Sequence, residues 1–263
     1  MEKNYYNDRS DLRISGSGKF GGGKFNSVKI SGDGEIRGNL DCVDFKCSGS
    51  SSVEGDVLCQ EFKISGDTSI RGNVKSSVFS ISGASSINGN ITSDEMKISG
   101  DSKIGGDVSV GQLKISGDSK VGGNLKGDGI KIFGGVKVGG NCEAEQFTCH
   151  GAFNIGEMLN AEKIEINPGG ECRTKEIGGK EIEVRLRAKD SLFMNFIRFA
   201  SFSKSRLICD SIEGDNIYLE ATKASIVRGK NITIGERCEI DTVEYSGDIT
   251  ILDGAIVKNQ IKI

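Results

Sequence analysis

Apolar residues recur along most of this chain with a period of seventeen, and the clearest copy of the unit runs from residue 97 to residue 113. Apolar residues occupy its second, eighth, twelfth and seventeenth positions, and Gly, Ser, Asn and Asp fill much of the rest. Successive copies place the following residues at the second position: Ile30, Cys47, Ile64, Ile81, Ile98, Ile115, Ile132, Cys149 and Ile166. These spacings do not produce the three-and-four recurrence of an amphipathic helix. The pattern instead predicts short β-strands separated by glycine corners.

Nine copies of this unit fill residues 13–164, which indicates a solenoid. A short strand cannot bury its apolar face alone. A coil with three short strands per turn can, because like residues then stack in columns about 4.8 Å apart. Connections between parallel strands are right-handed by default. We therefore predict an all-β fold, a right-handed parallel β-helix with turns of about 17 residues.

The pattern divides the chain into four segments. Residues 1–12 form an N-terminal tail, 13–181 the regular β-helix, 182–210 a basic and phenylalanine-rich insertion or lid, and 211–263 the C-terminal β-helical turns. Three strands in register are expected in the last segment, at Ile217 and Leu219, Ile232 and Ile234, and Ile249 and Ile251.

The stretch from 185 to 206 is unlike the rest of the chain. Its basic residues are Arg185, Arg187, Lys189, Arg198, Lys204 and Arg206, against Asp190 alone. Phenylalanine recurs at every third residue, at Phe193, Phe196, Phe199 and Phe202. Two interpretations stay open: an interface that docks on a membrane surface or a neighbouring subunit, and a lid that folds over the coil. The four phenylalanines and Arg198 are candidate interface residues.

The C-terminal turns end in Ile261-Lys262-Ile263 without an evident polar cap. A bare terminal turn of a solenoid exposes unpaired N–H and C=O groups and part of its core. Ile261 and Ile263 are therefore candidate residues for end-on self-assembly.

Eight cysteines raise the question of disulfides. Four of them, Cys47, Cys142, Cys149 and Cys172, occupy apolar columns and behave as small hydrophobic residues. Cys42 and Cys59 share a small-residue column one turn apart, where they could bridge. Residues 1–11 lack the apolar stretch of a secretory signal, and no run is long enough to span a membrane. We expect reduced core thiols and a cytoplasmic protein, with attachment to the membrane surface as the alternative.

The sequence offers no catalytic constellation. The only histidine, His150, falls in an outward column without a second catalytic signature. Asparagines at the eleventh position are expected to hydrogen-bond from turn to turn, and no calcium-binding Gly-Gly-x-Gly-x-Asp run occurs. A net charge of -3 gives no nucleic-acid footprint. We expect no enzyme, no cofactor, no metal and no nucleic-acid partner.

The Ile-x-Gly-x3-Ile-x-Gly-x-Leu/Val pattern, seen in residues 63–79 and 97–113, resembles the bactofilins, bacterial polymer-forming cytoskeletal proteins. The resemblance covers residues 13–164 well. It implies a right-handed β-helix that polymerises end to end without nucleotide, often near the membrane, and scaffolds envelope or shape functions. The expected partners are further copies of the chain, and a membrane surface or an envelope-associated protein. The alternatives are a non-polymerising adaptor that docks through 185–206 and, less favoured, a carbohydrate-binding or polysaccharide-active β-helix.

Overall fold

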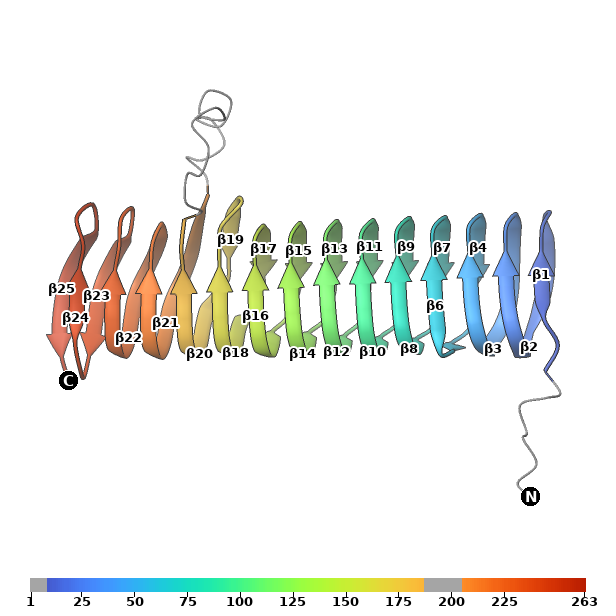
Figure 1. The fold of residues 1–263 in the computed structure, drawn as a ribbon, viewed down its shortest axis with the longest axis horizontal. Helices are drawn as coiled ribbons and strands as arrows, with labels where there is room; N and C mark the ends of the chain where they lie inside the picture. Colours follow the sequence, from blue (N-terminus) through green and yellow to red (C-terminus); the bar gives the residue numbers. More distant parts are fainter. Residues whose placement is uncertain (1–8, 187–204) are drawn as a thin grey trace, which may run out of the picture. The chain divides into compact units, whose positions relative to one another are not determined.

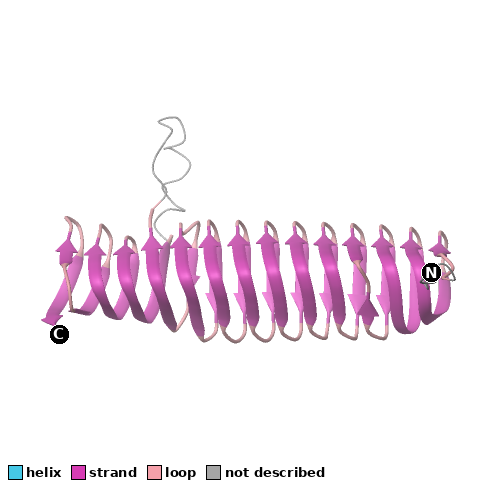
Figure 2. Ribbon diagram, turned by 60° about the horizontal axis from the view of Figure 1, so that its bottom comes forward, coloured by secondary structure: helices cyan, strands magenta, loops and turns pink. Residues whose placement is uncertain are grey.

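The computed structural model describes residues 9–186 and 205–263, which belong to two compact units, residues 1–124 and residues 125–263. Every regular element in the described ranges is a β-strand, and Figure 2 shows strands and turns without a helix. The all-β prediction is confirmed.

The described part of unit 1, residues 9–124, contains thirteen strands. Their bounds are β1 Leu12–Ile14, β2 Gly18–Ile30, β3 Asp33–Cys47, β4 Ser50–Val53, β5 Val57–Leu58, β6 Glu61–Ile64, β7 Asp67–Ile70, β8 Val74–Ile81, β9 Ala84–Ile87, β10 Ile91–Ile98, β11 Asp101–Ile104, β12 Val108–Ile115 and β13 Asp118–Val121.

Consecutive turns of unit 1 pair in parallel with the predicted register. Ile91 of β10 faces Val108 of β12, and Ile98 faces Ile115, seventeen positions later in each case. In Figure 1 the long strands rise on the near side while the chain advances from right to left, which makes the coil right-handed. The parallel β-helix and its handedness are as predicted.

The turn of β4, β5 and β6 has the three strands that were expected, whereas the regular turns from β7 onward have two. The eight-residue strand bends in its middle, and its register with the next turn skips one residue there, at Asp94 in β10. The buried hydroxyl of Ser93 closes this bend by donating to the carbonyl oxygens of Ser77 and Glu95, at 3.1 and 2.9 Å. One bent strand therefore covers two sides of the coil.

The core consists of the predicted apolar columns. Phe45, Phe62 and Phe79 are buried and stack with ring centroids 4.8 and 4.7 Å apart, close to the spacing of paired strands. The outer corner carries the predicted amide ladder. Asn73 Oδ1 accepts from the backbone N–H of Asn90 at 2.8 Å, and Asn90 Oδ1 accepts from that of Asp107 at 2.8 Å.

The described residues of unit 2, 125–186 and 205–263, contain the other twelve strands. Their bounds are β14 Leu125–Ile132, β15 Gly135–Val138, β16 Cys142–Cys149, β17 Ala152–Ile155, β18 Met158–Ile166, β19 Glu171–Arg173, β20 Glu176–Val184, β21 Arg206–Leu219, β22 Thr222–Ile234, β23 Glu239–Tyr245, β24 Ile249–Ile251 and β25 Ile256–Lys262.

Unit 2 begins with the seventeen-residue register and then departs from it. Leu125 faces Cys142, but Phe153 faces Cys172 because the corner before β19 is enlarged around Pro168. The three C-terminal strands lie in register as predicted: Ile217 faces Ile232, and Ile232 faces Ile249. Strand β20 reaches Val184 and β21 starts at Arg206, so the described residues on both sides of the insertion are strand.

Candidate self-association surfaces

The last turn of unit 2 leaves core columns uncovered. Ile232, Ile234 and Ile240 are buried, and the residues that face them one turn later are Ile249, Ile251 and Val257. Ile251 is 37% exposed, whereas Ile234 in the same column is fully buried. These last residues form an apolar patch, which we call the C-terminal face, because no further turn of the described chain covers them.

The two isoleucines singled out from the sequence lie at the rim of this face. Ile261 is 45% exposed and faces Glu244, in a column that also contains Arg228, so its position is an outward one. Ile263 is 71% exposed, and its backbone N–H donates to the carbonyl oxygen of Tyr245 at 3.0 Å. Sequence reasoning missed the residues at the centre of the face, although the register of Ile249 and Ile251 with the preceding strands was the signal for them.

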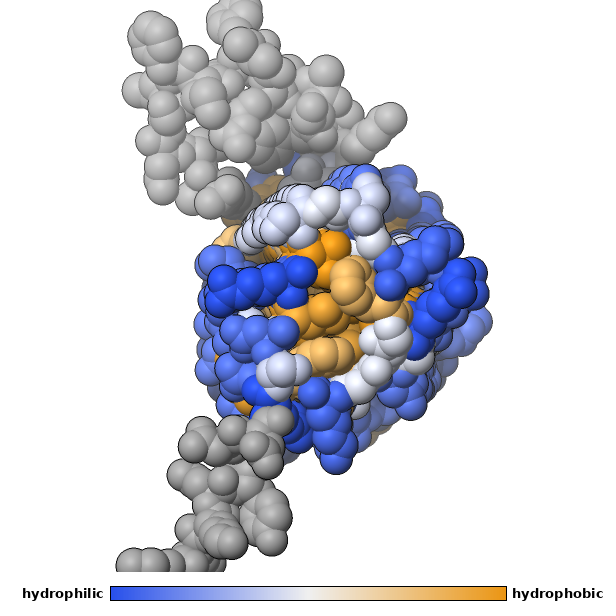
Figure 3. All heavy atoms as spheres, turned by 90° about the vertical axis from the view of Figure 1, so that its right-hand side faces the viewer, coloured by the Kyte–Doolittle hydropathy of each residue, from blue (hydrophilic) through white to orange (hydrophobic). Residues whose placement is uncertain are grey.

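The first turn of unit 1 leaves columns open in the same way. Leu12 faces Val28, Phe20 faces Ile36 and Phe25 faces Cys42. The first member of each pair is half-exposed and the second is buried. Figure 3 looks at this end and shows an apolar centre surrounded by polar atoms. We call Leu12, Phe20 and Phe25 the N-terminal face.

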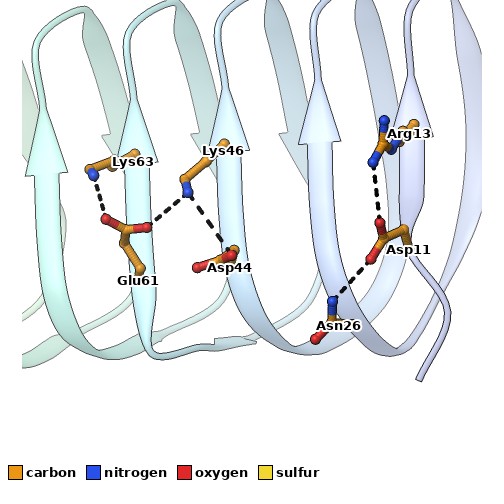
Figure 4. A network of polar contacts seen from close by, with 7 residues as sticks. All are labelled: Asp11, Arg13, Asn26, Asp44, Lys46, Glu61 and Lys63. Carbon is orange, nitrogen blue, oxygen red and sulfur yellow. Dashed lines mark hydrogen bonds and ion pairs between the residues drawn. The ribbon is translucent and has the colours of Figure 1, made fainter. Parts of the chain in front are cut away.

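Ion pairs tie the turns of unit 1 together close to the N-terminal face. Arg9 donates two hydrogen bonds to the Asp41 carboxylate, at 2.7 and 3.1 Å, which holds the residues before β1 against β3. Asp11 accepts from Arg13 at 3.4 Å and from Asn26 at 3.2 Å (Figure 4). These bonds hold the pKa of the Asp11 carboxyl below its ordinary value.

A second group of ion pairs in unit 1 joins Lys46 and Lys63 to nearby carboxylates. Lys46 lies 2.9 Å from Glu61 and 3.9 Å from Asp44, and Lys63 also pairs with Glu61 (Figure 4). Hydrogen bonds from Lys63 and Lys46 lower the pKa of Glu61 to about 2. Glu61 thus balances lysines of two consecutive turns.

A groove of about 730 Å³ crosses several turns of unit 2. Its floor is backbone, because Gly179, Gly214 and Gly229 follow one another in register. A Cβ on Gly229 would lie 2.5 Å from the Gly214 carbonyl oxygen, so tight stacking of the turns explains these glycines. Its wall residues include Glu176, Glu213, Asp215, Arg228 and Lys230. Sequence reasoning missed this groove, for which the aligned glycines were the signal.

The residues that lead into the insertion contact side chains of the following turn. The backbone N–H of Leu186 donates to Glu220 at 2.7 Å, and Tyr218 donates to the same carboxylate at 2.6 Å. The Arg185 guanidinium lies 3.9 Å from the centroid of the Tyr218 ring. Residues 187–204 lie outside the described ranges, and with them Phe193, Phe196, Arg198, Phe199 and Phe202. Their docking on a membrane surface or an envelope-associated protein stays a prediction.

The only histidine of the sequence lies beside an aromatic ring in the described ranges. His150 is half-exposed and stacks on Phe133, with ring centroids 5.5 Å apart. In the described ranges, no three His, Cys, Asp or Glu side chains gather where they could hold a metal ion. Those ranges also contain no helix that is long and apolar enough to cross a membrane.

Parts of the chain are similar to two proteins of Bacillus subtilis strain 168. A 107-residue stretch is 37% identical to the uncharacterized protein YhbE of Bacillus subtilis strain 168, and covers 40% of this chain and 43% of that protein. An 89-residue stretch is 42% identical to the uncharacterized protein YhbF of the same strain, and covers 34% of each chain. The matched part therefore spans less than half of either relative. No solved structure matches the chain.

The bactofilin family, described as polymer-forming cytoskeletal, matches residues 6–92 and again residues 60–143. The two matches overlap and together cover just over half of the chain, including almost all of the regular seventeen-residue repeats. The match thus coincides with the part of the coil where the columns are most regular. The chain belongs to the bactofilin family.

Proposed function

We propose that this protein is a non-enzymatic scaffold that polymerises without nucleotide through the ends of its β-helical coil. The family description supports polymer formation, and the two open faces support the ends as the contacts. The observation that carries the proposal is the uncovered C-terminal face, where columns buried one turn earlier end in Ile249, Ile251 and Val257.

The strand edges support the same contact. Among the described strands, β25 pairs only with β23 and β1 pairs only with β2. Each terminal strand thus offers one unpaired row of N–H and C=O groups beside apolar side chains. Such an edge is a template for pairing with another chain. A second copy of the chain can pair with the strand edge and also cover the apolar side chains, because its own terminal face has an unpaired strand edge and exposed apolar side chains.

The free cysteines support a cytoplasmic location for the polymer. All eight cysteines are free and buried. Reduced thiols are typical of cytosolic proteins, and we place the assembly in the cytoplasm. Its partners are then further copies of the same chain.

The test is Ile251→Lys, which puts a charge at the centre of the C-terminal face. We expect the wild-type protein to form filaments or concentration-dependent oligomers in sedimentation and negative-stain imaging, without added nucleotide. The variant should remain small at the same concentrations, because a lysine buried in the contact has no partner. The matched control is Leu58→Lys, since Leu58 is 48% exposed but lies far from the terminal turns in sequence.

Thermal melting establishes that both variants are folded. A wild-type protein that stays monomeric at high concentration would overturn the proposal. Undiminished assembly of the folded Ile251→Lys protein would exclude the C-terminal face as the contact.

A further inference from the structure

The eight buried cysteines divide into two groups by their neighbours. Four are surrounded by other residue types. Cys47 faces Ile64, Cys142 faces Leu159, Cys209 faces Ala224, and the Cys238 thiol donates to the Leu219 carbonyl oxygen at 3.3 Å. The remaining four form two pairs, Cys42 with Cys59 in unit 1 and Cys149 with Cys172 in unit 2.

The first pair is brought together by the register of the coil. Asp41 of β3 faces Leu58 of β5, so the next residues, Cys42 and Cys59, face each other on consecutive turns. Paired strands place such residues about 4.8 Å apart, and Cα atoms of disulfides are usually about 4.4–6.8 Å apart. Both side chains point into the core, where the neighbouring Cys42 side chain and burial raise the pKa of the Cys59 thiol.

The second pair is brought together by the enlarged corner of unit 2. Cys172 of β19 faces Phe153, and Cys149 ends the strand that precedes Phe153 in the same turn. The Cys172 Sγ lies 3.6 Å from the carbonyl oxygen of Gly151, which follows Cys149 closely in the chain. The neighbouring Cys149 side chain and burial raise the pKa of the Cys172 thiol. As in the first pair, the two cysteines belong to consecutive turns.

We propose that Cys42–Cys59 and Cys149–Cys172 are two sites of disulfide formation that link consecutive turns of the coil when the protein meets a peroxide. Hydrogen peroxide oxidises one thiolate to a sulfenic acid and releases hydroxide, which takes up the proton lost by that thiol to give water. The second thiolate attacks the sulfenic sulfur, the S–S bond forms, and the hydroxyl leaves as a second water with the proton of the second thiol. Two thiols and one peroxide thus give one disulfide and two waters.

The two thiols in unit 2 influence each other. The Cys172 side chain, together with a hydrogen bond from the backbone of Gly151, lowers the pKa of Cys149, while the pKa of Cys172 is raised. The thiolate is the form that peroxide oxidises, and the other thiol of the pair then resolves the sulfenic acid. Because both thiols are buried, peroxide reaches them when adjacent turns open locally.

The experiment treats the native full-length protein with hydrogen peroxide, alkylates the remaining thiols with iodoacetamide, and maps the unreduced peptides by mass spectrometry. We expect two cross-linked peptide pairs, 42–59 and 149–172, each lighter by two hydrogens. Cys47, Cys142, Cys209 and Cys238 should be alkylated. A parallel sample oxidised in urea should give mixed pairings, since eight free cysteines allow many connectivities.

Single substitutions make the assignment specific. Cys172→Ser should abolish the 149–172 link and leave 42–59, and Cys59→Ser should do the reverse. Eight alkylated cysteines in the native sample, under conditions that fully oxidise the urea sample, would overturn the proposal. So would native links that involve any of the other four cysteines.

Discussion

A column of hydroxyl groups runs inside the coil of unit 1, next to the aliphatic columns. Its members are Ser51, Thr68, Ser85, Ser102 and Ser119, and all five are buried. Ser51 and Thr68 hydrogen-bond to each other at 3.0 Å, and Ser102 donates to Ser119 at 3.1 Å. Ser85 lies between these two pairs, and its hydroxyl has no partner among the described residues. An odd number of hydroxyls that bond in pairs leaves one over.

This pairing predicts that two Ser-to-Ala substitutions in the column change the free energy of unfolding in opposite directions. Ser85→Ala removes an unpaired buried hydroxyl and should raise the free energy of unfolding by about 1 kcal/mol. Ser102→Ala leaves Ser119 unpaired and should lower it by about 1–3 kcal/mol. Urea unfolding followed by circular dichroism measures both. Equal destabilisation by the two substitutions would show that Ser85 has a hydrogen-bond partner in solution.

The buried hydroxyl column was not predicted from the sequence, whereas the apolar columns beside it were. Ile104 and its equivalents were predicted to face inward because they are apolar, and they are buried. Ser102, two residues earlier on the same short strand, also faces inward. Alternation along a strand requires this. Serine also occurs at corners of this chain, however, as at Ser99, so the residue type alone did not place Ser102 in the core.

At the scale of elements, the corners depend on glycine for a steric reason. A Cβ at Gly66 would lie 2.0 Å from the Gly49 carbonyl oxygen of the preceding turn, and Gly83 meets Gly66 in the same way. No real Cβ contact is that short, and both atoms are fixed by the ladder between turns. The recurring glycine was read from the sequence as a sign of corners, and the contact between successive corners explains why it recurs.

We therefore predict that Gly66→Ala destabilises the coil by about 1–3 kcal/mol, the range for overpacked sites. The control is Gly21→Ala, because a Cβ there has no atom within 4 Å. That variant should unfold at the same urea concentration as the wild type or at a slightly higher one, since alanine restricts the unfolded chain. A Gly66→Ala protein as stable as the control would mean that the turns can separate locally at little cost.

At the scale of the molecule, prediction was accurate where the repeat is regular and poorer where its length changes. The columns of residues 13–164 follow from one period, and the family match covers nearly the same stretch. Later turns change register, as where Asn216 and Asn231 hydrogen-bond fifteen residues apart at 2.9 Å. Each change in the number of residues per turn shifts the corners along the sequence. A fixed period of seventeen residues therefore no longer predicts their positions. The groove along Gly179, Gly214 and Gly229 lies where the period had already failed.

The role of the insertion does not follow from the repeat. A corner of the regular repeat can, however, be used to replace the insertion in an experiment. Val184 pairs with Ile166 and Arg206 pairs with Glu171, so both lie in the columns that flank the enlarged corner of the preceding turn. Regular turns join those columns through two residues, such as Ser99 and Gly100. Replacing residues 185–205 with Ser-Gly should therefore give a protein whose Tm falls by only a few degrees.

This variant separates the scaffold from the adaptor. If end contacts hold the polymer together, filaments should still form, and any binding of the wild-type protein to anionic vesicles in co-sedimentation should disappear. The double substitution of Phe196 and Phe199 by Ser, which keeps the length of the insertion, is the matched control and should also lose vesicle binding without loss of Tm. A large fall in the Tm of the shortened chain would identify the insertion as a lid over the coil. Loss of filaments at an unchanged Tm would move the contact between copies from the open faces to the insertion.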